Sequence, residues 1–314
     1  MPSDGLTGFS NAAFGIALGL YLLAMVGYFH HLAYRRGRVL SVARWLAYAG
    51  VAVHAASVVT RGMAAGRVPW GNLYEYVAVL GLLIVAAYLA LERMWRSEAV
   101  GGFVLGLAVA AMGGATLVYV PPGPLVPALN SYWLRIHVLM AVLASALFAL
   151  GAVFSVLYLV QDRRERRSAV AASVSTRQPA LVGAVDERPE DYVPAEAPES
   201  EPAPPRRSRL PAAASLDAMA YRAIVFAFPI WTLAVVFGAI WAEEAWGRYW
   251  AWDPKEVWAF ITWVVFAAYL HARATVGWRG RKAATLALVG FGTLVFNLTV
   301  VNTVLPGLHS YSGT

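Results

Sequence analysis

The sequence predicts an all-α fold: a polytopic membrane protein of about eight transmembrane helices. Of its 314 residues, 59% are hydrophobic and only 14% are charged, whereas a typical soluble domain has about 25% charged residues. Several apolar runs reach about 20 residues, which is the helix length needed to cross a hydrocarbon core roughly 30 Å thick. Composition and run length together exclude an ordinary soluble globular protein.

Eight apolar runs meet this length requirement. They lie near residues 9–33, 39–61, 73–92, 99–121, 134–160, 218–241, 255–275 and 284–305. The segment before the first run carries Asp4 and no basic residue, so it lacks the charged leader of a secretory signal. We therefore expect the first run to be retained as a transmembrane helix.

Residues 162–215 interrupt this apolar pattern. The segment is rich in Ala, Pro, Glu, Arg and Ser, and such a composition buries too little apolar surface to offset the entropy lost on ordering. We predict a disordered cytoplasmic linker here. It separates helices 1–5, in residues 1–161, from helices 6–8, in residues 216–314, and the two parts are expected to pack as one membrane domain.

The basic residues predict the orientation of the helices. Only five of the 25 fall in or beside the loops of one side, and these are Arg61, Arg67, Arg135, Arg248 and Lys255. The side rich in Arg and Lys is normally cytoplasmic, which would place both termini outside. The net charge of +7 is then explained by topology and membrane lipid, without a nucleic-acid partner.

A tryptophan-rich segment lies between the sixth and seventh apolar runs, on the predicted outer side. Trp246, Trp250 and Trp252 fall within seven residues, and Asp253 follows them directly. An interfacial aromatic belt would spread its rings over many helix ends, so the concentration favours a flat aromatic ligand. The run from Asp253 to Glu256 has the residue types of a helix start, with Asp at the N-cap, then Pro and Glu.

Three of the six histidines are candidate ligands of haem iron. His137, a few residues into the fifth run, and His309, after the eighth, would flank the tryptophan segment on the outer side. Neutral imidazole is the usual haem ligand, which predicts that the two share one iron. His271 lies about 24 Å from the outer end of its helix at 1.5 Å per residue. An ionisable group inside a span is a functional candidate, whereas His54 lies only about 10 Å deep by the same rise and should not share an iron with it.

These residues resemble a known family. The stretch Trp246–Glu256 is similar to the WWD signature of haem-handling proteins in cytochrome c maturation. The neighbouring segments 66–75, 132–137, 269–273 and 307–311 narrow the resemblance to the CcsA (ResC) family of the System II pathway. It covers about residues 45–160 and 216–312, while a WWD-like string alone would also fit the CcmC and CcmF relatives.

The resemblance implies a function and a set of partners. It implies that haem b is bound at the outer face of the bacterial cytoplasmic membrane by His137 and His309, beside Trp246, Trp250, Trp252 and Asp253. His271 would contribute to a second haem position, with the opposing ligand coming from a CcsB (ResB) partner. The pair would form a holocytochrome c synthase complex that attaches haem to the Cys-x-x-Cys-His segment of an apocytochrome c.

Other functions remain open at this stage. A haem exporter or chaperone without synthase activity fits the same residues, and a transmembrane haem redox protein would need histidines paired at matching depths. The chain contains no cysteine, so any thiol chemistry must come from a partner or substrate. The four outer arginines could pair with haem propionates or serve a purely structural role.

Overall fold

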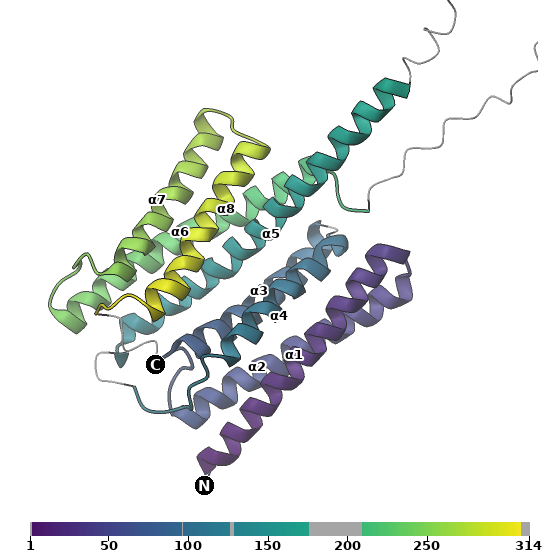
Figure 1. Cartoon of the computed structure of the whole chain (residues 1–314). Helices are drawn as coiled ribbons and strands as arrows, with labels where there is room; N and C mark the ends of the chain where they lie inside the picture. The colour runs from purple at the N-terminus through teal and green to yellow at the C-terminus, as the bar shows by residue number, and fades with distance from the viewer. Residues whose placement is uncertain (1, 96, 126–128, 176–208, 309–314) are drawn as a thin grey trace, which may run out of the picture.

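The computed structural model describes residues 2–95, 97–125, 129–175 and 209–308, and within these ranges it is dominated by long helices (Figure 1). All eight expected spans are confirmed as helices long and apolar enough to cross a membrane. The helices are α1 (Pro2–Tyr34), α2 (Gly37–Ala65), α3 (Leu73–Trp95), α4 (Gly101–Thr116), α5 (Tyr132–Ser175), α6 (Ala213–Trp246), α7 (Pro254–Thr275) and α8 (Arg281–Phe296). A short 3-10 turn, η1 (Glu98–Val100), precedes α4, and a π-helical turn, η4 (Asn297–Val301), follows α8.

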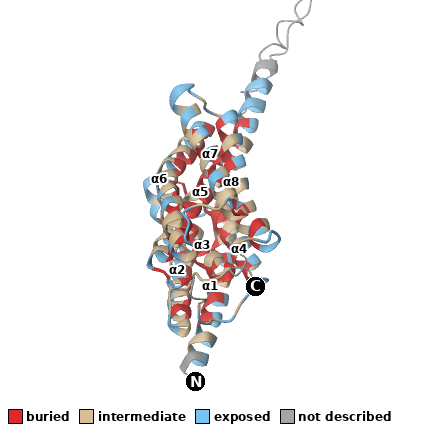
Figure 2. Ribbon diagram, turned by 90° about the vertical axis from the view of Figure 1, so that its left-hand side faces the viewer, coloured by how far each residue is buried: buried red, intermediate tan, exposed pale blue. Residues whose placement is uncertain are grey.

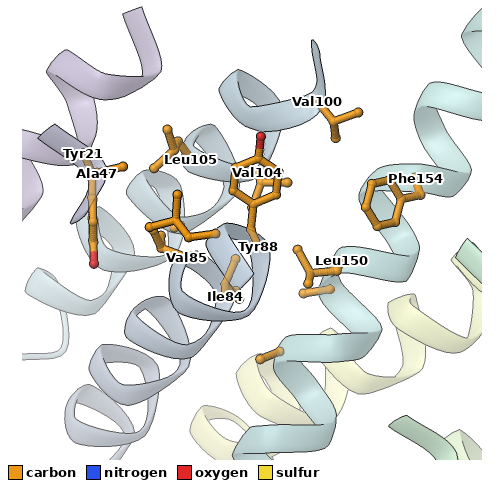
Figure 3. Packing of buried hydrophobic residues seen from close by; sticks show 14 of the residues in the cluster. Tyr21, Ala47, Ile84, Val85, Tyr88, Val100, Val104, Leu105, Leu150 and Phe154 are labelled. Atoms are coloured by element: carbon orange, nitrogen blue, oxygen red, sulfur yellow. The ribbon is translucent and has the colours of Figure 1, made fainter. Parts of the chain in front are cut away.

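The helices form two adjoining groups, α1–α4 and α5–α8 (Figure 1). Buried residues lie in the interior of the bundle, and many exposed residues lie on its outer parts and at its ends (Figure 2). One large apolar cluster joins the groups: Tyr21 of α1, Tyr88 of α3 and Phe154 of α5 all belong to it (Figure 3). Tyr76 of α3 also hydrogen-bonds Ser145 of α5 at 3.0 Å, so α3 and α5 form the junction.

The prediction of a disordered linker over residues 162–215 is wrong at both ends of that segment. Helix α5 continues to Ser175, and α6 begins at Ala213. Gln161 donates to Glu165 at 2.9 Å, and Arg166 pairs with Asp162 at 3.0 Å. These i,i+4 contacts stabilise a helix whose composition is polar. The remaining part of the linker, 176–208, lies outside the described residues.

The two ends of the bundle differ in charge. We call the end where α5 finishes and α6 starts the linker end. It carries many basic residues, among them Arg44, Arg93, Arg166, Arg273 and Lys282. Some of them are paired there, as Arg273 is with Asp217 at 2.8 Å. The opposite end, where α3, α5 and α7 begin and α6 and α8 finish, carries few basic residues and a pocket; we call it the pocket end.

Candidate functional site

The tryptophan segment forms the turn between α6 and α7 at the pocket end. Gly247 closes α6 with φ +70°, in the left-handed region that favours glycine. Asp253 caps α7 by accepting from the backbone N–H of Lys255 at 3.0 Å, and Glu256 accepts from that of Asp253 at 3.1 Å. The predicted helix start is therefore confirmed as a capping box.

A cavity of about 190 Å³ opens beside this turn, between α3, α5, α6, α7 and the end of α8. Its wall is mainly apolar and aromatic, which suits a large flat ligand. The aromatic and histidine side chains that line it are Trp70, Tyr76, His137, Trp231, Trp241, Tyr249 and Trp250. We call this cavity the aromatic pocket.

His137 is held in a defined orientation on the pocket wall. Its Nδ1 lies 2.7 Å from the carbonyl oxygen of Ala234. Because a carbonyl only accepts, Nδ1 carries the hydrogen, and in the neutral ring Nε2 then carries the lone pair, as in most metal-ligating histidines. The ring lies nearly parallel to that of Trp241, with centroids 6.3 Å apart and an angle of 16°. A Cβ at Gly238 would lie 2.8 Å from the ring, so α6 has glycine where the imidazole packs.

The three tryptophans of the segment occupy different environments. Trp250 lines the pocket, whereas Trp252 is 71% exposed and contacts Trp250 edge-on at 5.8 Å. Trp246 packs against Trp241 at 4.8 Å, in a small cluster with Leu129 and Leu134. Of the three tryptophans of the segment, Trp250 lines the pocket, and Trp241 of α6 supplies a further ring there.

Asp253 also contacts the chain that follows α8. Its second carboxylate oxygen accepts from the backbone N–H of Leu308. A Cβ at Gly307 would lie 2.5 Å from that oxygen, so glycine allows the close approach. His309 itself lies outside the described residues, but the residue before it is held at the start of α7.

His271 and His54 lie apart from this pocket and from each other. His271 is exposed on α7, on the same face as Phe260 and Val264. His54 of α2 is fully buried, with Phe14 and Tyr21 in ring contact, and neither ring nitrogen has a hydrogen-bond partner among the described residues. The two histidines therefore belong to different helical groups.

Two of the four outer arginines have a structural role. Arg61 and Arg67 both bind Glu75, at 2.9 and 2.7 Å, and Glu75 is fully buried. Glu75 also accepts from the backbone N–H of Gly71 at 2.8 Å, which fixes the Trp70–Gly71 stretch of the wall. None of the four arginines is among the pocket-lining side chains of the described residues.

Sequence reasoning missed several wall residues. Trp70 lay within a segment that carried the resemblance, and it could have been proposed from that. Trp231 and Asn297 carry no local signal, because one sits within an apolar run and the other follows one. Their part in the pocket depends on helix packing alone.

Comparison with known proteins assigns the family. The profile of the family described as cytochrome c assembly protein matches residues 70–309. The chain belongs to this family. CcsA proteins of Synechococcus sp. (strain JA-3-3Ab) and Gloeobacter violaceus are 36% and 34% identical, each over 96% of this chain and 93% and 94% of their own lengths. CcsA of Synechococcus elongatus is 40% identical over 82% of this chain and 83% of its own length. The expected resemblance to CcsA is thereby confirmed.

A solved structure supports the fold. Cytochrome c haem lyase CcmF superposes with a TM-score of 0.61 at 20% identity, over 92% of this chain. This chain spans 46% of that protein, and the likeness at this identity concerns the fold alone. As a cytochrome c assembly protein with eight apolar helices, the chain is a multi-pass membrane protein of cytochrome c maturation.

Proposed function

We propose that the chain binds haem b in the aromatic pocket, at the outer face of the bacterial cytoplasmic membrane, and presents it to apocytochrome c together with a CcsB/ResB-type subunit. The observation that carries the proposal is His137: an imidazole oriented by a carbonyl, in an aromatic pocket that adjoins the tryptophan segment. An oriented Nε2 lone pair in an apolar, aromatic cavity is what haem ligation requires.

The second axial ligand in this proposal is His309. Leu308 is hydrogen-bonded to Asp253 at the start of α7, and Trp250, three residues before Asp253, lines the pocket. Leu308, the residue before His309, is therefore held at the same end of the bundle as His137. Two imidazoles on one iron would hold haem while its edge remains open to a second substrate.

The charge distribution supports the outer location. The basic residues of the loops gather at the linker end, and the positive-inside rule predicts that this end is cytoplasmic. The pocket end then faces outward, with the tryptophan segment and both termini. Apocytochromes receive their haem on that side, so the pocket would be where the two meet.

His271 serves a second haem position in this proposal. It is exposed on the outside of α7, where a neighbouring subunit could supply the opposing ligand. A transmembrane redox protein would instead pair histidines across the interior, but His54 is packed between aromatic rings in the other helical group. The geometry favours haem handling over electron transfer.

The covalent step, the attachment of haem to the apocytochrome, requires no oxidation or reduction by the protein. Each apocytochrome thiol would add across a haem vinyl C=C, so one C–S and one C–H bond form as S–H and the π bond break. The chain, which has no cysteine, would contribute orientation, and positioning two reactants is worth several kcal/mol of barrier.

The experiment uses the full chain co-purified with its partner subunit. His137→Gly should lose the bis-histidine haem spectrum and c-type cytochrome assembly, and added imidazole should restore both, because the cavity left by the ring admits a free ligand. His31→Gly, which removes a histidine at the linker end, is the matched control. Normal haem content and assembly in His137→Gly would refute the proposed ligand.

A further inference from the structure

The aromatic pocket has one polar corner, made where α7 begins and α8 ends. Lys255, Asn297 and Asn302 line it, and the rest of the wall is dominated by aromatic and aliphatic side chains. The chain has only two lysines, and the other, Lys282, is exposed at the linker end. Lys255 is thus the one lysine placed to act on a ligand in this pocket.

Hydrogen bonds tie the three polar residues together. The Lys255 ammonium donates to the amide oxygen of Asn302, and the Asn297 amide nitrogen donates to the Lys255 carbonyl at 3.3 Å. Asn297 is only 6% exposed, and its amide oxygen has no hydrogen-bond partner among the described residues. Buried polar atoms are nearly always paired, so this oxygen calls for a partner from a ligand or its water.

The backbone at this corner departs from the regular α-helix. Residues Asn297–Val301 form a π-helical turn directly after α8. Such turns are uncommon and frequent at functional sites, because they re-aim side chains out of the helical register. Here the turn begins at Asn297, the residue with the unpaired oxygen.

The charges around the corner favour an anionic ligand near Lys255. Asp253 and Glu256 are close, but the two Asp253 oxygens accept from the N–H groups of Lys255 and Leu308, and Glu256 accepts from Ala251 and Asp253. Their charge is therefore engaged by the N-terminus of α7, as in an ordinary helix cap. An ammonium has three donors, and Lys255 is the basic residue on the described wall of the pocket, whose polar residues also include Asn72 and Glu256.

We propose that this corner is the subsite for the carboxylate side chains of haem, its propionates. The inference rests on haem being the ligand of the pocket. Lys255 and Asn302 would donate to a carboxylate, and Asn297 would accept from a water shared with it. Because the propionates share one edge of the porphyrin, the corner would select one orientation of the ring and leave the vinyl groups away from α7 and α8.

The test compares haem b with its dimethyl ester, which keeps the iron and ring but has no carboxylate. Binding of both to the full chain with its partner subunit is measured by titration of the absorbance band. The wild type should bind haem b about 10- to 100-fold more tightly than the ester, as expected for a lost hydrogen bond to a charged group. Lys255→Met should lose most of this preference, Lys255→Arg should keep it, and Lys282→Met should be unchanged.

The outcomes separate this subsite from haem binding itself. If the wild type binds both porphyrins equally, or Lys255→Met keeps the preference, the subsite is refuted while haem binding stands. If neither porphyrin binds the wild type, the proposed function fails. Asn297→Ala serves as a second variant if Lys255→Met fails to fold. If Asn297→Ala keeps the full preference for haem b over the ester, that result counts against the subsite. Oleate is added as a competitor of haem b. If oleate displaces haem b from the wild type but not from Lys255→Met, the corner binds a lipid carboxylate instead.

Discussion

Asp253 makes two contacts that can be broken separately, and this allows a sharp test of the site. One oxygen caps α7 by accepting from Lys255, and the other accepts from Leu308, the residue before His309. Asparagine caps a helix about as well as aspartate does. It has only one acceptor oxygen, however, and its amide nitrogen would face the Leu308 N–H as a second donor. Asp253→Asn should therefore keep the cap and release the Leu308 contact.

The expected magnitudes differ between variants. A hydrogen bond to a charged group contributes about 1.5–3 kcal/mol. Asp253→Asn should therefore lower the equilibrium constant for forming the contact between residue 253 and Leu308 about 10- to 100-fold. Haem retention should fall with it if His309 is a ligand. Asp253→Ala loses the cap as well, which costs about 1 kcal/mol more. Asp253→Ser, which retains a cap oxygen and has no second acceptor, should behave like Asp253→Asn.

Three measurements distinguish the contacts. Haem content comes from the absorbance spectrum, stability from thermal unfolding in detergent, and the tether from hydrogen exchange of the peptide containing Leu308. Faster exchange and lost haem at nearly unchanged stability are expected for Asp253→Asn. Full haem retention despite faster exchange would show that the Leu308 contact does not support haem binding, and unchanged exchange would refute the tether. A loss of stability equal to that of Asp253→Ala would show that Asp253 acts only as a cap.

Three further sets of substitutions, in the pocket wall and in the residues that support it, have expected outcomes. Gly238→Ala places a methyl group 2.8 Å from the pocket imidazole and should lose haem, while Gly113→Ala, which meets open space, should not; haem content checks both. Glu75→Ala leaves two arginines without their buried partner, which should lower the free energy of unfolding by about 3–5 kcal/mol, measured as a fall in the melting temperature. Trp250→Ala should weaken haem binding, whereas Trp252→Ala, at an exposed side chain, should leave it within about twofold; equal losses in a haem titration would contradict the wall geometry.

Local patterns made part of this structure predictable from the sequence. A helix that crosses a bilayer must satisfy its backbone internally over about 20 apolar residues, so run length alone located the eight helices. The capping box at Asp253 was equally predictable, because a cap depends only on residues within one turn. His137 could be named as a candidate because it is polar within an apolar run.

Tertiary packing decided the features that the sequence did not predict. Trp252 and Trp250 are two residues apart in one motif, yet one is exposed and the other lines the pocket, since a turn aims neighbouring side chains differently. Arg61 pairs with Glu75 from another helix, which no spacing rule anticipates. The polar start of the linker is helical because Asp162 also binds Arg281 of α8 at 2.6 Å, a contact that composition cannot reveal.

The helices differ in whether they line the aromatic pocket or support it. Among the described residues, those that line the aromatic pocket come from the stretch Trp70–Asn302, which lies within the family match over residues 70–309. Helices α1 and α2 precede this match and pack in the large apolar cluster with α3 and α4. Arg61 of α2 connects this part to the pocket wall, because it pairs with Glu75, which accepts from the backbone N–H of Gly71 beside Trp70. In the proposed function the first two helices therefore contribute to haem binding by stabilising α3, and we expect substitutions in them to change haem affinity only to the extent that they destabilise α3.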